Sequence, residues 1–161
     1  MNHRLLETKQ RDVNYAITHG IYKNRHRLLK QHRVDDSLCS NQACRISGME
    51  ETVEQEHVFS LCFKVQTAWI WLREKVIEMM RDQGPAPSIS NTELLMFMYP
   101  GCRREAEVTF LLSTYRELVN KEAVGKQNEL MLGTLRGVVR AKVEHLRSRA
   151  VPDLHFPPGW L

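Results

Sequence analysis

The chain has 161 residues, of which 42% are apolar and 26% are charged, so it is long enough to bury a core and too apolar for wholesale disorder. Its 23 Lys and Arg against 19 Asp and Glu give a formal net charge of +4. No apolar run approaches the roughly 18 residues of a membrane helix, and residues 1–7 lack the apolar stretch of a secretory signal, so neither a membrane span nor a disulfide-rich secreted scaffold is expected.

The charge is segregated along the chain. Residues 1–34 carry eight Lys or Arg against two acids, residues 35–62 carry one Arg against six acids, and residues 125–161 carry six basic residues against three acids. Three of the four cysteines lie in the acidic segment. This distribution predicts two basic regions and a cysteine-containing acidic insert, and basic regions are typical of chains that bind nucleic acid.

Apolar residues recur every three or four positions in several segments, which is the period of an amphipathic helix. In chain order, the pattern predicts helices over residues 5–18, 21–33, 63–81, 91–98, 104–124 and 127–150, and a helical turn over 50–60. In the second of these helices, Ile21, Leu28 and Leu29 are expected to face inward. No segment alternates for long with period two, so we predict an all-α fold.

Four side chains that bind metals follow one another in the acidic segment, with the spacing Cys39-x4-Cys44-x12-His57-x4-Cys62. Thiolate and imidazole are ligands that zinc prefers, and four protein ligands leave no open position for a water molecule. The pattern therefore predicts one structural zinc ion, whose binding would supply the folding energy of a lobe with little core of its own.

The alternative interpretation is three buried or unrelated cysteines beside a solvated histidine. His32 is a weaker competing ligand because it lies seven residues before Cys39 in a basic helix. Cys102 lies outside the pattern and is expected to be a buried thiol.

These expectations define an organisation for the whole chain. The sequence Gly84-Pro85-Ala86-Pro87-Ser88 indicates a linker, because proline resists helix formation. A helical bundle with a zinc-stapled lobe inserted between its helices is predicted: a basic helical pair over 1–34, the zinc-binding lobe over 35–62, a helical region over 63–150 with a linker over 84–91, and an extended tail over 151–161.

The metal-ligand segment also resembles a known family. The two cysteines, Glu51-Thr52, His57 and Cys62, followed by Trp69, resemble the zinc-binding region C-terminal to the polymerase of non-LTR (LINE-type) retrotransposon reverse transcriptases. Further resemblance lies upstream and downstream, in Thr18-His19-Gly20, Arg27-Leu28-Leu29 and Leu111-Leu112-Ser113-Thr114-Tyr115-Arg116. The resemblance implies an intracellular, nuclear protein whose zinc region helps to hold template RNA or target DNA during target-primed reverse transcription.

The chain lacks the motifs of an enzyme. Polymerase chemistry on two metal ions needs several carboxylates, including a pair in a strand turn. Val34-Asp35-Asp36 resembles such a pair, but a basic helix precedes it and no β pattern flanks it. Glu56-His57 lacks the second histidine of a His-Glu-x-x-His site. We therefore expect no catalytic residue and no small-molecule substrate.

Two sets of basic residues are candidates for binding the phosphates of RNA or DNA. The first precedes the metal ligands and comprises Lys23, Arg25, Arg27, Lys30 and Arg33; the second is on the last predicted helix and comprises Arg136, Arg140 and Arg147. The alternative for each set is a solvated helix face. The candidates for stacking on bases are Tyr15, Tyr22 and Trp71.

A second hypothesis is a zinc-stapled interaction module that packs against a polymerase body or another protein. Trp160, which follows Pro157-Pro158, and Trp71 on the outer side of its helix would then be docking residues. The alternative for Trp71 is that it covers a neighbouring helix.

Overall fold

The computed structural model describes residues 6–52, 55–81, 88–96, 103–123, 132–149, 154–157 and 159–160. The fold is all-α, as predicted, and no strand occurs in these ranges, apart from one isolated antiparallel bridge between Leu38 and Glu50. The elements in chain order are α1 (Thr8–Thr18), α2 (Arg25–Lys30), α3 (Gln42–Ile46), a π-helical turn η2 (His57–Leu61), α4 (Gln66–Arg81), α5 (Asn91–Met96), α6 (Glu105–Ala123) and α7 (Leu132–Ser148).

The long helices agree with the predicted ones within a few residues, but α2 is much shorter than the helix predicted over 21–33. The side chain of Asn24 accepts a hydrogen bond from the backbone N–H of Arg27, which caps the helix and makes Arg25 its first residue. His32, with a φ of 54°, lies beyond its end. Ile21 therefore lies outside the helix and is 46% exposed, so the prediction that it faces inward was wrong.

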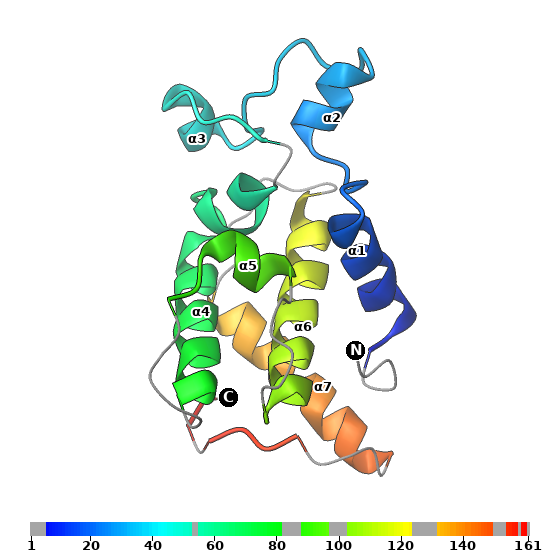
Figure 1. Ribbon diagram of the computed structural model, residues 1–161, viewed down its shortest axis with the longest axis vertical. Coiled ribbons are helices and arrows are strands. Elements are labelled where there is room, and N and C mark those ends of the chain that lie inside the picture. The colour runs from blue at the N-terminus through cyan, green and yellow to red at the C-terminus, as the bar shows by residue number, and fades with distance from the viewer. Residues whose placement is uncertain are drawn as a thin grey trace.

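Four helices form the body of the molecule: α1 packs on α6, and α4 and α7 pack on α6 and on each other. Figure 1 shows α2 and α3 together at one end of the long axis, beyond these four helices. The body encloses an apolar core whose fully buried side chains include Leu72, Val76, Leu94, Leu111, Leu112, Tyr115, Val119, Leu135 and Val139. None of the described helices combines the length and the apolar character that a membrane span requires.

A polar seam crosses the contact between α1 and α6, formed by Gln10 and Asn14 on α1 and by Ser113, Thr114 and Arg116 on α6. Gln10 Nε2 donates to Thr114 Oγ1 at 3.1 Å, and Asn14 Nδ2 donates to Ser113 Oγ at 2.9 Å. The guanidinium of Arg116 donates to Asn14 Oδ1 at 3.0 Å. All five side chains are buried, so these hydrogen bonds fix how the two helices face each other.

In its described residues, the C-terminal segment, predicted as an extended tail, runs across the end of the helical body that lies opposite α2 and α3 (Figure 1). Leu154 and Trp160 are buried, and the Nζ of Lys75 lies 4.5 Å from the centre of the Trp160 ring. Arg136 on α7 donates to the carbonyl oxygens of Gly159 and Trp160. Because Trp160 is covered by its own chain, it is not exposed to dock a partner.

Several expectations fall partly or wholly outside the described residues. Among them are the proline-containing part of the linker over 84–91, the burial of Cys102, the first residues of the tail, and the predicted helical residues 97–98 and 127–131. Trp71 is half-buried and packs against the core, which fits the interpretation that it covers a neighbouring helix.

Candidate metal centre

The first two metal-ligating residues come from a short loop and the helix that follows it. The backbone N–H of Cys39 donates to Met49 O, and the bridge between Leu38 and Glu50 closes the loop. Asn41 caps α3 by accepting a hydrogen bond from the backbone N–H of Cys44 at 3.2 Å. The cap fixes the direction of a helix of only five residues, which carries the Cys44 thiol into the interior.

The other two ligating residues lie at the two ends of the π-helical turn η2. His57 is its first residue and Cys62 follows its last, and the backbone N–H of Cys62 donates to His57 O at 2.7 Å. A π-helical turn is rare and is concentrated at functional sites. Here it brings His57 and Cys62 to the same side, facing Cys39 and Cys44.

The four predicted ligands meet at one point. All four are buried, and their ligand atoms lie within 4.8 Å of one another. The sulfur atoms of Cys39 and Cys44 each lie 3.7 Å from that of Cys62. A tetrahedron with a zinc–sulfur distance of about 2.3 Å has edges of about 3.8 Å, so this sulfur spacing fits a tetrahedral metal ion.

The donor set fits a metal on two further counts. Within the described residues, the Nε2 atom of His57 is buried and has no hydrogen-bond partner, which is unfavourable for a polar atom unless it has a ligand. Three thiolates in so small a volume repel one another, and a divalent cation at their centre turns this repulsion into attraction. Cys39, Cys44, His57 and Cys62 are therefore positioned to bind a metal ion with no open coordination position, as a structural site requires.

Backbone N–H groups point at the sulfurs and tune their charge. Asn41 donates to Cys39 Sγ and Phe63 donates to Cys44 Sγ, each at 3.4 Å. The hydrogen bond with Cys62, followed by those from His57 and Asn41, lowers the pKa of Cys39 to about 4 against the effect of burial. The same hydrogen bond raises the pKa of Cys62, and burial raises the pKa of Cys44.

A layer of ion pairs and hydrogen bonds holds the loop around these ligands. Asp36 binds the guanidinium groups of both Arg25 and Arg45, and these contacts, that from Arg45 foremost, lower its pKa to about 2. Glu51 is buried and accepts a hydrogen bond from the backbone N–H of Arg25 at 2.5 Å. The side chain of Asn24 donates to Thr52 O at 2.8 Å. The start of α2 is therefore tied to both ends of the loop that carries Cys39 and Cys44, which is the first part of the metal-binding segment, residues 39–62.

Phe59 joins the metal-binding segment to the body of the molecule. Its side chain is fully buried, with its ring 4.9 Å from that of Tyr22. The hydroxyl of Tyr115 on α6 donates to Phe59 O at 2.5 Å, and the Tyr115 ring lies 5.5 Å from that of Trp69 on α4. Aromatic packing thus fixes the orientation of η2 relative to α4 and α6.

The structure separates the basic residues predicted to bind phosphates into two kinds. The exposed ones are Lys23, Lys30, Arg33, Arg140 and Arg147. Arg25 is half-buried in its ion pair with Asp36, Arg27 donates to Gly20 O at 3.2 Å, and Arg136 binds the C-terminal segment. Lys23 precedes the Asn24 cap, so Lys23, Arg27 and Lys30 do not line one face of one helix.

Some residues of the site have no counterpart in the predicted set, and one predicted competitor is excluded from it. His32 is exposed and lies outside the ligand cluster. Asn41, Glu51 and Tyr115 support the ligands without being predicted to do so. An asparagine three residues before Cys44 is a recognisable helix cap, whereas nothing in the sequence indicates that Tyr115 reaches the carbonyl of Phe59.

Comparison with models of protein families, with curated proteins and with solved structures found no match for this chain.

Proposed function

We propose that the chain is a non-catalytic module in which one zinc ion, held by Cys39, Cys44, His57 and Cys62, positions a basic surface around α2 that binds RNA or DNA. The four convergent ligands carry the proposal. Three sulfurs and one imidazole suit zinc among the metals of the cell, and a filled coordination sphere suits a structural role.

The basic surface comprises Lys23, Arg27, Lys30 and Arg33, which lie on α2 and in the segments that flank it. No Asp or Glu is present between Asp12 and Asp35, so no acidic residue within this stretch offsets these four cations, and Asp36 pairs with Arg25, which is not one of them. Asn24 and Arg25 tie α2 to the metal-binding segment. The metal would therefore fix the position of cations that contact phosphates.

The resemblance to the region C-terminal to the polymerase of non-LTR reverse transcriptases supports the same proposal. It would make the nucleic acid the template RNA or the target DNA of target-primed reverse transcription. Of the residues that carry the resemblance, the four ligands converge, and the ring of Trp69 lies 5.5 Å from that of Tyr115, whose hydroxyl donates to Phe59 O in η2.

The metal is tested by elemental analysis of the purified full chain. We expect one zinc per chain, its loss in Cys62→Ser, and its retention in the matched control Cys102→Ser, because Cys102 lies outside the ligand pattern. Replacing zinc with cobalt should produce the visible bands of a tetrahedral thiolate site. A zinc content far below one per chain, or equal content in both variants, would remove the metal from the proposal.

Nucleic-acid binding is tested by a salt titration with labelled RNA and DNA. The variant Arg27→Ala/Lys30→Ala should weaken binding and lower the salt dependence by about one counterion for each phosphate that it no longer neutralises. The matched control Arg81→Ala/Arg103→Ala removes the same charge from exposed residues away from α2. Wild-type chain that binds neither RNA nor DNA at low salt contradicts the proposal, as does an equal effect of the two variants.

One observation favours a second candidate function, a protein-interaction module. Ile46, Leu61 and Phe63, on or beside the metal-binding segment, are exposed by 80%, 43% and 39%. Exposed apolar side chains of this kind are found where proteins dock. Ile46→Ser/Phe63→Ser should abolish such docking while leaving nucleic-acid binding unchanged, and this separates the two functions.

A further inference from the structure

The outer face of α1 carries an exposed aromatic pair. The buried residues of this helix, Gln10, Val13, Asn14 and Ile17, face α6, while Tyr15 points away from it and is 59% exposed. The rings of Tyr15 and His19 lie one turn apart, with centres 4.1 Å from each other. Two exposed rings in contact keep apolar surface in water, which is a typical feature of a binding surface.

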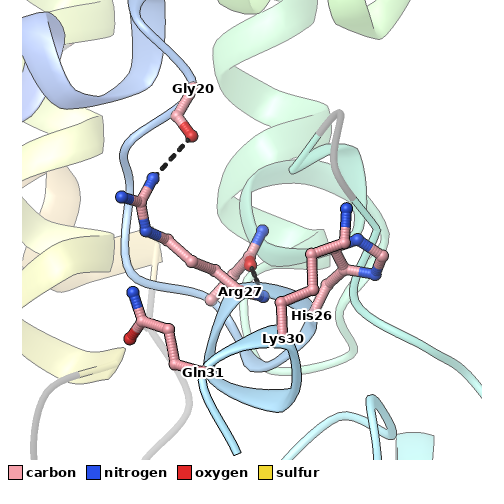
Figure 2. A pocket seen from close by; sticks show the side chains of 6 residues that line it. Gly20, His26, Arg27, Lys30 and Gln31 are labelled. Carbon is pink, nitrogen blue, oxygen red and sulfur yellow. Dashed lines mark hydrogen bonds between the residues drawn. The ribbon is translucent and has the colours of Figure 1, made fainter.

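The residue that follows His19 in the sequence, Gly20, lines a pocket of about 310 Å³. The described lining residues are Gly20, Asn24, His26, Arg27, Lys30 and Gln31 (Figure 2). Among the described residues, its lining includes two cations and a histidine and no acidic side chain. Figure 2 shows the guanidinium of Arg27 extended to the carbonyl of Gly20, a contact of 3.2 Å. This contact holds a cation at the wall of the pocket.

His26 adds an unsatisfied polar atom to this wall. Its Nε2 is buried and has no hydrogen-bond partner among the described residues. His26 and Lys30 are four residues apart on α2 and are therefore neighbours on its surface. When Nε2 carries a proton, the imidazole can donate to a phosphate oxygen, and the ammonium group of Lys30 offers further donors and a positive charge.

The aromatic pair and the pocket are continuous along the chain. His19 precedes Gly20, whose positive φ of 63° turns the chain from α1 into the segment that leads to α2. The backbone N–H of His19 donates to Tyr15 O, and Arg27 binds Gly20 O, so backbone hydrogen bonds and one side chain fix the two features together. The Tyr15 and His19 rings are tilted by 42°, so a base can stack on the exposed face of one of them. An exposed ring beside a phosphate pocket matches the two chemical parts of a nucleotide.

From this juxtaposition we infer that the module binds a single strand, with an unpaired base stacked on the Tyr15 ring beside His19 and a phosphate held by His26, Arg27 and Lys30. Base faces are accessible in single strands and are covered by their neighbours in a duplex. The inference rests on the proposed function and adds the strand type and the residues that recognise it.

The test compares Tyr15→Ala with Tyr15→Phe, which keeps the ring, in the zinc-loaded full chain. Binding is measured by fluorescence anisotropy to oligo(U), oligo(dT) and a duplex of equal length. Tyr15→Ala should weaken single-strand binding about ten-fold and leave duplex binding and the salt slope unchanged, since stacking is lost and no charge is removed. Tyr15→Phe should stay within about two-fold of wild type. Unchanged thermal unfolding is the folding control, because Tyr15 is exposed.

The stacked base is observed directly with an oligonucleotide that contains 2-aminopurine, whose fluorescence is quenched by stacking. Quenching should appear with wild type and Tyr15→Phe and disappear with Tyr15→Ala. Loss of quenching with Tyr15→Ala, on either RNA or DNA, supports the inference. The strand that the wild type binds more tightly is the preferred nucleic acid.

Two results would overturn the inference, and they differ in what else they remove. If wild type binds and Arg27→Ala/Lys30→Ala weakens it, but Tyr15→Ala affects single strand and duplex equally or not at all, only the stacking surface is refuted. If wild type binds no nucleic acid, the proposed function fails together with the inference.

Discussion

The metal-binding lobe, residues 37–62, and the helical body formed by α1, α4, α6 and α7 are stabilised by different means. In the body, long helices bury apolar side chains such as Leu72, Leu111 and Val139 against one another. In the described part of the lobe, the regular elements are the five residues of α3 and the five of η2, and three of its buried side chains are cysteines.

Stability is therefore unevenly distributed in this chain. Apolar burial contributes roughly 25 cal/mol per Å², which accumulates along helices of 16 to 19 residues such as α4 and α6. The lobe has little such area, and coordination of a structural zinc ion contributes on the order of 10 kcal/mol in small domains of this kind. We expect the two regions to respond separately to removal of the metal and to truncation of core side chains.

Removal of the metal should have the largest effect and should be confined to the lobe. Without the cation, the three closely packed thiols and His57 no longer hold residues 37–62 together, and the free energy of folding supplied by coordination is lost. Hydrogen exchange measured with and without a strong chelator should show loss of protection in α3 and η2 and retention in α6 and α7. Uniform loss of protection throughout the chain would contradict this separation.

A cavity created in the helical body should destabilise the body and leave the metal site intact. Leu111 is fully buried on α6, so Leu111→Ala should lower the free energy of unfolding by about 2–5 kcal/mol. The metal content should equal that of the wild type, because Leu111 does not supply a ligand. The matched control is Ile70→Ala on α4, which is 49% exposed and should change stability by less than about 0.5 kcal/mol. Denaturant unfolding measures the stability of both variants, and metal analysis measures their zinc content. Loss of zinc from Leu111→Ala would mean that the lobe and the body are more tightly coupled than we propose.

Tyr115→Phe tests the junction between the two regions. The variant keeps the ring but removes the hydroxyl that donates to Phe59 O, leaving a buried carbonyl without that partner. The expected cost is about 1–3 kcal/mol. Tyr15→Phe, at an exposed tyrosine, is the control. Because the bond connects η2 to α6, zinc should also dissociate faster from Tyr115→Phe, whereas a change in stability with no change in zinc release would place the effect in the body alone.

The features that the sequence predicts are those that depend on local pattern or on rare residue types. Apolar residues that recur every three or four positions locate α4, α6 and α7. The spacing of three cysteines and one histidine identifies the metal-ligand cluster. The polar seam was not predictable, because Asn14 and Arg116 meet only after the chain has folded. For the same reason, the sequence does not indicate that Arg25 forms an ion pair with Asp36. The start of α2 could have been predicted correctly from the sequence. Asparagine is a common helix-capping residue, so Asn24 indicates a helix that begins at Arg25.

Asn41→Ala should have the smallest effect and tests whether the lobe has any order of its own. The side chain caps α3, which carries Cys44, and loss of such a cap costs about 1 kcal/mol. Asn41→Ser keeps a capping oxygen and is the matched control. If local hydrogen bonds pre-orient the ligands, Asn41→Ala should release zinc to a coloured chelator several-fold faster than wild type, with Asn41→Ser in between, while unfolding of the body is unchanged. Equal release rates in all three proteins would mean that the metal alone determines the geometry of α3, and the two regions would then differ even more than the structure indicates.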